Sequence, residues 1–143
     1  MPGDYAKLTA WERKIARIKD PVQRALHMTA RDYRIDISAN FDKSVSPYGE
    51  AWKKRTRSYP HKLLLQTSKM RHGWRVRVQG ETIVFVNVDG RGIAKFHQNG
   101  TRFMVERPAA PNKRGLPDRY EKILRDNMVT EISRDLGARL GAD

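Results

Sequence analysis

The sequence predicts an α+β fold, and three observations support this class. Apolar residues recur at three- and four-residue intervals through the first 43 residues and again near the C-terminus, which predicts helices at both ends. Between them the apolar period changes to two, which is typical of strands. Proline and glycine cluster in the connecting stretches and mark loops. Since no internal repeat or composition break divides the chain, we expect residues 1–143 to form a single domain.

Two helices are expected at the N-terminus. Residues 1–20 are interpreted as a helical arm whose apolar stripe consists of Tyr5, Leu8, Trp11, Ile15 and Ile18. Asp20 then resembles an N-cap with Pro21 at the first helical position, where the missing N–H costs nothing. A long helix is therefore predicted over 21–43. Its buried face is expected to hold Val22, Leu26, Ala30, Tyr33, Ile37 and Phe41.

The middle of the chain is expected to hold a basic loop over 44–61 and then a short helix and a sheet within 62–112. The helix is predicted at Lys62–His72, followed by an antiparallel hairpin over about 74–88 that turns at Gly80 and Glu81. One helical turn is expected at Ile93–His97, and a third strand is predicted over Thr101–Arg107.

A long C-terminal helix is predicted over 117–138. It is expected to begin near Pro117 and Asp118, after an extended proline-rich connection. Its apolar residues follow each other at four-residue intervals, at Tyr120, Leu124, Met128, Ile132 and Leu136. This spacing predicts one buried face along the whole helix.

Positive charge is concentrated in one part of the chain. The sequence has 29 Lys and Arg against 16 Asp and Glu, a net charge of +13. No acidic residue occurs between Glu50 and Glu81, and this stretch contains the basic block, defined as Lys53, Lys54, Arg55, Arg57, Lys62, Lys69, Arg71, Arg75 and Arg77. Such a block fits a surface that faces nucleic acid phosphates. A solvated face or a basic contact with a partner subunit remains an equal alternative.

Several kinds of chemistry find no support in the sequence. The absence of cysteine excludes disulfides and every Cys-based metal site. No apolar run approaches the roughly 20 residues of a membrane helix, and the N-terminus lacks a signal-peptide pattern, so we expect a soluble protein without membrane contact. The four histidines show no metal-ligand spacing, and neither a metal nor a cofactor is expected. His97, beside two amide residues, is the only candidate catalytic group, and we favour a structural role for it.

Trp52 lies alone among lysines and arginines. An aromatic side chain in a basic run can stack on a nucleic acid base. We favour the alternative that Trp52 packs the loop onto the protein core.

Four segments, taken in order, resemble the virion-morphogenesis (tail-completion) family of tailed phages. The family pattern runs Gly-x-x-Trp, Leu-x-Thr-Gly-x-Leu, Tyr-Ala-x-x-His-Gln-x-Gly-Thr and a basic Arg-Pro segment before a C-terminal helix. The matching residues are Gly49, Trp52, Leu65, Thr67, Met70, Ala94, His97, Gln98, Gly100, Thr101, Arg107 and Pro108. Ser68 replaces the usual glycine, Ile93 replaces the usual tyrosine, and Ala109-Ala110 replaces a bulky apolar pair.

The resemblance implies structural work at the head–tail junction of the virion, after assembly in the host cytoplasm. Such proteins form a ring, here expected to be a hexamer, around the DNA channel, and they contact other neck and tail proteins such as a terminator or connector. DNA in the channel would be contacted without sequence specificity. His97 and Gln98 would then pack or hydrogen-bond within the fold, and no enzymatic activity is implied.

Two alternatives come from other functional classes. The first is a free nucleic-acid-binding protein that uses the basic block and Trp52. The second is a nuclease that uses His97. A ring subunit also needs apolar surface for its neighbours, and Phe96, Phe103 and Met104 are candidates. Of these, we expect Phe96 to face the core more readily than Met104.

Overall fold

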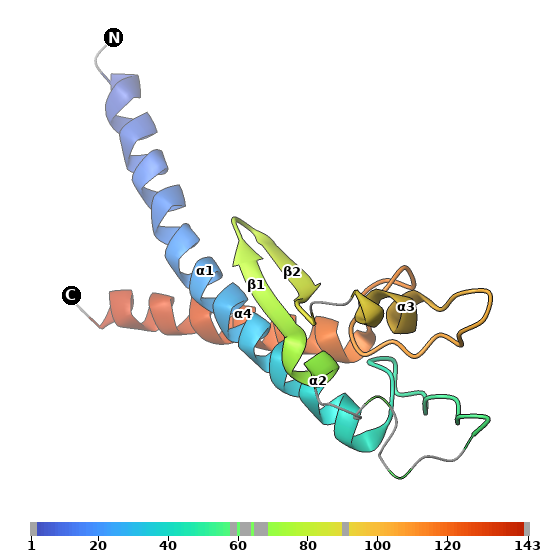
Figure 1. The fold of residues 1–143 in the computed structure, drawn as a ribbon. Helices are drawn as coiled ribbons and strands as arrows, with labels where there is room; N and C mark the ends of the chain where they lie inside the picture. The colour runs from blue at the N-terminus through green and yellow to red at the C-terminus, as the bar shows by residue number, and fades with distance from the viewer. Residues whose placement is uncertain (1–2, 58–59, 61–63, 65–68, 90–91, 142–143) are drawn as a thin grey trace.

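The computed structural model is α+β, and it describes the chain except residues 1–2, 58–59, 61–63, 65–68, 90–91 and 142–143 (Figure 1). The helices and strands, in order, are α1 (Gly3–Lys43), α2 (Lys69–Gly73), β1 (Trp74–Gln79), β2 (Thr82–Asn87), α3 (Ile93–Asn99) and α4 (Asp118–Leu140). Figure 1 shows α1 and α4 crossing each other, with the hairpin beside α1 and the loops gathered at one end.

The separation of the N-terminal region into an arm over 1–20 and a helix over 21–43 is wrong, because α1 continues through Pro21. Proline inside a helix removes one backbone hydrogen bond and crowds the preceding turn, which kinks the helix without necessarily ending it. Good helix formers such as Arg17, Arg24 and Leu26 flank this position. Figure 1 shows the axis of α1 bending in its blue first half, away from the rest of the molecule.

The buried face predicted for the second half of α1 is confirmed. Tyr33, Ile37 and Phe41 are almost completely buried. Ile37 and Phe41 belong to a core that also contains Trp52, Trp74, Ala109 and Ala110. Tyr33 instead stacks on Tyr120 of α4, with ring centroids 4.3 Å apart, and on Phe85 of β2 at 5.8 Å.

The hairpin is confirmed, with antiparallel pairing from Trp74 opposite Asn87 to Gln79 opposite Thr82. A two-stranded sheet is marginally stable alone, so its packing against α1 is what holds it. The third strand expected over Thr101–Arg107 is absent from the sheet that the structure describes. Residues 101–104 instead form a turn in which the backbone amides of Thr101 and Met104 each donate to the other residue's carbonyl. These backbone groups are therefore not paired with a strand.

Within the described residues, the helix predicted over Lys62–His72 is confirmed only from Lys69, where α2 begins. Leu64 has a φ of +61°, which is left-handed and incompatible with a helix at that position. Residues 61–63 and 65–68 of the predicted helix lie outside the described residues. The helical turn at Ile93–His97 is confirmed as part of α3.

The start of α4 after Pro117 is confirmed, but its predicted buried face is only half correct. Tyr120 is completely buried, whereas Ile132 and Leu136 are 38% and 52% exposed. A helix turns about 100° per residue, so residues spaced strictly by four drift about 40° around the axis at each step. The stripe therefore starts against α1 and ends facing solvent.

Candidate functional site: a loop platform with exposed cations

The basic loop leaves the end of α1 and folds back on itself. Val45 and Ala51 form an isolated antiparallel bridge, and the Trp52 amide donates to the Ser44 carbonyl at 2.8 Å. The hydroxyl of Ser46 accepts hydrogen bonds from the amides of residues 48 and 50. Gly49 has a φ of +86°, a conformation that glycine adopts without a steric penalty. These local bonds shape the start of the loop.

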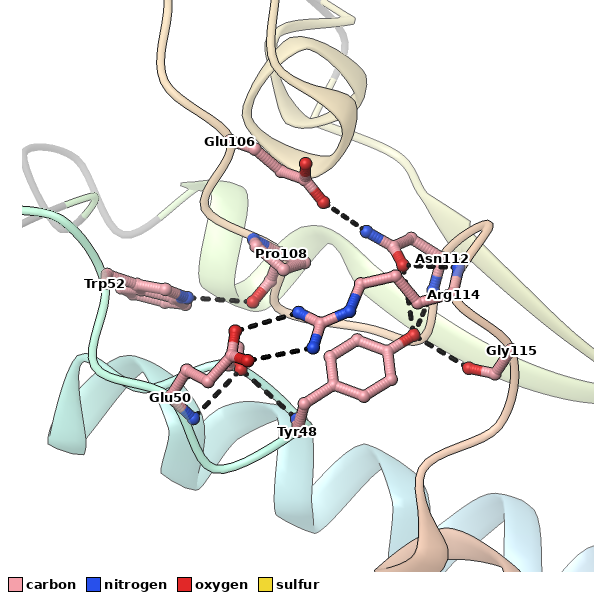
Figure 2. Close-up of polar contacts among 9 residues, drawn as sticks. Tyr48, Glu50, Trp52, Glu106, Pro108, Asn112, Arg114 and Gly115 are labelled. Carbon is pink, nitrogen blue, oxygen red and sulfur yellow. Dashed lines mark hydrogen bonds and ion pairs between the residues drawn. The ribbon is translucent and has the colours of Figure 1, made fainter.

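Trp52 and Arg107 join this loop to the segment before α4. The indole Nε1 of Trp52 donates to the Pro108 carbonyl at 2.8 Å (Figure 2). The Trp52 ring also meets the Phe41 ring edge-on. The buried guanidinium of Arg107 donates to the carbonyls of Lys53 and Lys54 at 2.9 and 3.3 Å. Trp52 thus packs the loop onto the core, as favoured from the sequence. The backbone of the two lysines is held while their side chains are exposed.

Gln98 connects α3 to the same segment. Its side-chain Oε1 accepts from the amides of Ala109 and Ala110 at 3.1 and 3.3 Å, and its Nε2 donates to the carbonyls of Ala110 and Pro111. The side chain is buried. Because every one of these contacts is with backbone, the role that the structure shows for Gln98 is to fix the segment 109–111.

The outer edge of the contact between the basic loop and the segment before α4 is polar. The guanidinium of Arg114 makes two hydrogen bonds to Glu50, at 2.8 and 2.9 Å, and lies 4.1 Å from the ring centroid of Tyr48 (Figure 2). The Tyr48 hydroxyl donates to the Gly115 carbonyl and accepts from the Asn112 amide. The pairing with Arg114 lowers the pKa of Glu50, and the pKa of Arg114 is raised in turn. We call residues 44–57 and 98–117, joined in this way, the loop platform.

The structure divides the basic block into engaged and exposed cations. Arg71 forms an ion pair with Asp42 at 2.8 Å and donates to Ser38, and Arg75 donates to the carbonyls of His72 and Trp74. Arg55 is half-buried, and Lys62 lies outside the described residues. The side chains that are exposed, and that pair with no carboxylate of the described chain, are Lys53, Lys54, Arg57, Lys69 and Arg77. Three of these five belong to the loop platform.

His97 is a half-buried residue of α3. Its backbone carbonyl accepts from the Arg107 amide at 2.7 Å, and its Nδ1 has no hydrogen-bond partner in the part of the chain that the structure describes. Burial lowers the pKa of His97 below 6.5, and the nearby positive charge of Arg107 lowers it further. The imidazole is therefore neutral at neutral pH.

The residues of the phage-family pattern meet in and around this platform. Trp52 contacts Pro108, Arg107 contacts His97, and Met70 packs against the core that contains Trp52. Other pattern residues have backbone or burial roles, namely Gly49 and Gly100 with positive φ, buried Ala94, and Thr101 at its turn. Leu65 and Thr67 lie outside the described residues.

Three features of the surface were not predicted from the sequence. Phe96 is 43% exposed while Met104 is half-buried, so the expectation for these two was reversed. The Glu50–Arg114 pair joins residues 64 positions apart, for which no local pattern exists. A groove between α1 and α4 also went unpredicted, since each helix contributes only part of its lining.

Comparisons with known proteins found no match for this chain among protein-family models, curated proteins or solved structures. Within the described residues there is no group of three or more His, Asp or Glu side chains placed to hold a metal ion. No helix in the same residues is long and apolar enough to cross a membrane.

Proposed function

We propose that this chain is a structural subunit of a tailed-phage head–tail junction, a tail-completion or neck protein that assembles as a ring around the DNA channel. The contact between Trp52 and Pro108 carries the proposal. These residues belong to the first and last of the four segments of the phage-family pattern and lie 56 positions apart. The third segment contacts the residues after Pro108 through Gln98. The meeting of these segments in one platform supports the resemblance on which the proposal rests.

The exposed cations support DNA as the partner of such a ring. Lys53, Lys54 and Arg57 extend from a backbone that Arg107 and Trp52 hold in place. A ring repeats these charges in every copy, and their combined field attracts a polyanion without reading its sequence. Arg71 and Arg114 contribute less, since Asp42 and Glu50 neutralise them.

The same cations also suit a free nucleic-acid-binding protein, so the deciding property is assembly. The first experiment is electron microscopy of the purified chain and of virions labelled for it. We expect rings from the purified chain and label at the head–tail junction. A chain that remains monomeric at all concentrations and still binds DNA would favour the free nucleic-acid-binding protein.

The second experiment measures DNA affinity as a function of salt. Replacing Lys53, Lys54 and Arg57 with glutamine should reduce the slope of log K against log salt by roughly 2 to 3, since each phosphate contact contributes about 0.9. The control replaces Lys19, Lys95 and Arg125, which are also exposed but lie outside the loop platform, and it keeps the net charge equal. Equal effects of the two triple variants would show that the loop platform is not the DNA-binding surface.

A further inference from the structure

The loop between α3 and Pro108 ends in a defined turn, which we call the Phe103 tip (residues 100–106). The Thr101 amide donates to the Met104 carbonyl at 2.8 Å, and the Thr101 hydroxyl accepts from the amides of Phe103 and Met104. Gly100 has a φ of +70°, and a Cβ there would lie 3.1 Å from the Glu106 nitrogen. The backbone of the tip is therefore shaped by specific contacts and by a required glycine.

The tip presents an aromatic side chain to solvent. Phe103 is 92% exposed and Val105 is 42% exposed. The guanidinium of Arg102 lies 5.6 Å from the Phe103 ring centroid. Covering such apolar surface is favourable, and contiguous exposed apolar groups commonly mark a protein contact. The tip thus combines an apolar side chain with an adjacent positive charge.

Among the described residues, a groove with one unpaired carboxylate lies at the crossing of α1 and α4. Its volume is about 530 Å³, and its lining includes Met28, the carboxylates Asp20 and Glu131, and the guanidinium groups of Arg24 and Arg134. Both arginines pair with Glu131, Arg24 at 2.8 Å and Arg134 at 3.7 Å. Asp20 is exposed, and no cation of the described residues pairs with it. The groove therefore offers space beside an apolar side chain and one carboxylate that a cation could neutralise.

We propose that the Phe103 tip of one copy docks into the α1–α4 groove of the next copy, with Arg102 facing Asp20. The loop after α3 lies at one end of the molecule, away from the crossing of α1 and α4 (Figure 1), so one copy meets the next head to tail. Repetition of a head-to-tail contact closes a ring when the rotation between copies allows it. The inference rests on the proposed ring and specifies its copy-to-copy contact.

A protein partner suits the tip better than nucleic acid. The side chains of Phe103 and Val105 give phosphates nothing to bond, although Lys53 lines the same hollow as the tip. The groove of a second copy supplies both space for the phenyl ring of Phe103 and the unpaired carboxylate of Asp20 for Arg102. Stacking of Phe103 on a nucleic acid base is left as an outcome that would overturn the proposal.

The experiment measures self-association of the full chain by light scattering over a range of concentrations. Phe103→Ser should weaken association at least roughly tenfold while leaving the thermal unfolding midpoint unchanged, because the side chain is almost fully exposed. Val129→Ser is the matched control, since Val129 is also exposed and apolar but belongs to neither the tip nor the groove. It should change neither quantity.

Charge exchange tests the pairing itself. Arg102→Glu and Asp20→Lys should each weaken association. The double variant should restore it, because opposite charges would then face each other again at every contact, with their positions exchanged. Phe103→Ser chains that still form rings, or single variants without rescue, would overturn this contact and leave the ring standing.

Two further outcomes separate this contact from the proposed function. A wild-type chain that never associates would overturn both the contact and the ring. Loss of DNA affinity in Phe103→Ser with unchanged association would assign the tip to nucleic acid and overturn the docking proposal.

Discussion

The two ends of the contact between α1 and α4 are built from different chemistry. At one end Tyr33 and Tyr120 stack with ring centroids 4.3 Å apart, and the Tyr33 hydroxyl donates to the Tyr120 carbonyl at 2.6 Å. At the other end Arg24 pairs with Glu131 at 2.8 Å, and Asn127 donates to Thr29. The first end is aromatic and buried, with one ion pair between Arg119 and Asp36 beside it, and the second end is largely ionic and borders the groove.

The difference shows how one helix can serve both the core and the surface. The apolar residues of α4 drift around its axis, and in the second half of α4 polar residues such as Glu131 therefore face α1. Val129, Ile132 and Leu136 meanwhile become exposed. We infer that the aromatic end supplies most of the stability, whereas the ionic end leaves surface available for a partner.

The largest expected effect is at the aromatic end. Tyr120→Ala should lower the free energy of unfolding by about 3 to 5 kcal/mol, since it leaves a cavity against Tyr33 and Phe85. Urea unfolding followed by circular dichroism measures the loss. Tyr33→Phe, which removes only the hydroxyl, should cost about 1 kcal/mol. A Tyr120→Ala loss no larger than the Tyr33→Phe loss would contradict the assignment of stability to this end.

Alkaline pH should lower the folding stability through the same aromatic end. Burial raises the pKa of Tyr33 to about 12, with a smaller contribution from the negative charge of Glu121, and burial also raises the pKa of Tyr120. Since the ordinary value is 10.0, this contribution to stability is fully present below pH 10 and is lost as the pH rises through 12. Tyrosinate absorbance and circular dichroism should change together. If Tyr33→Phe leaves the titration and the alkaline unfolding unaltered, the prediction is wrong.

The smallest effect is expected at the ionic end. Glu131→Gln removes the charge that pairs with Arg24, but the Arg24 side chain is about half exposed, so water and salt screen the pair. The loss of stability should be smaller than for Tyr120→Ala and should shrink further in high salt. Leu136→Ser is the control on the outward face and should stay within about 0.5 kcal/mol of the parent chain. Equal losses at the two ends would remove the contrast between them.

Local periodicity predicted much of the fold. The buried face of Tyr33, Ile37 and Phe41, the hairpin and the start of α4 all follow from side-chain patterns within one element. Two errors came from local signals that a wider context overrode. Pro21 was interpreted as a helix start, although helix formers on both sides carry α1 through it. The β-like residues 101–107 form no strand, because Thr101 completes a turn with Met104.

The candidate site was predictable in composition but not in arrangement. The sequence alone determined that the chain is basic, that its cations gather between Glu50 and Glu81, and that helices flank a hairpin, because charge and periodicity are properties of neighbouring residues. Only the tertiary structure decided that Trp52 meets Pro108, that Arg71 is neutralised by Asp42, and that Phe103 projects from the surface. Those outcomes depend on which distant groups the packing of the core brings together, and no local pattern encodes that choice.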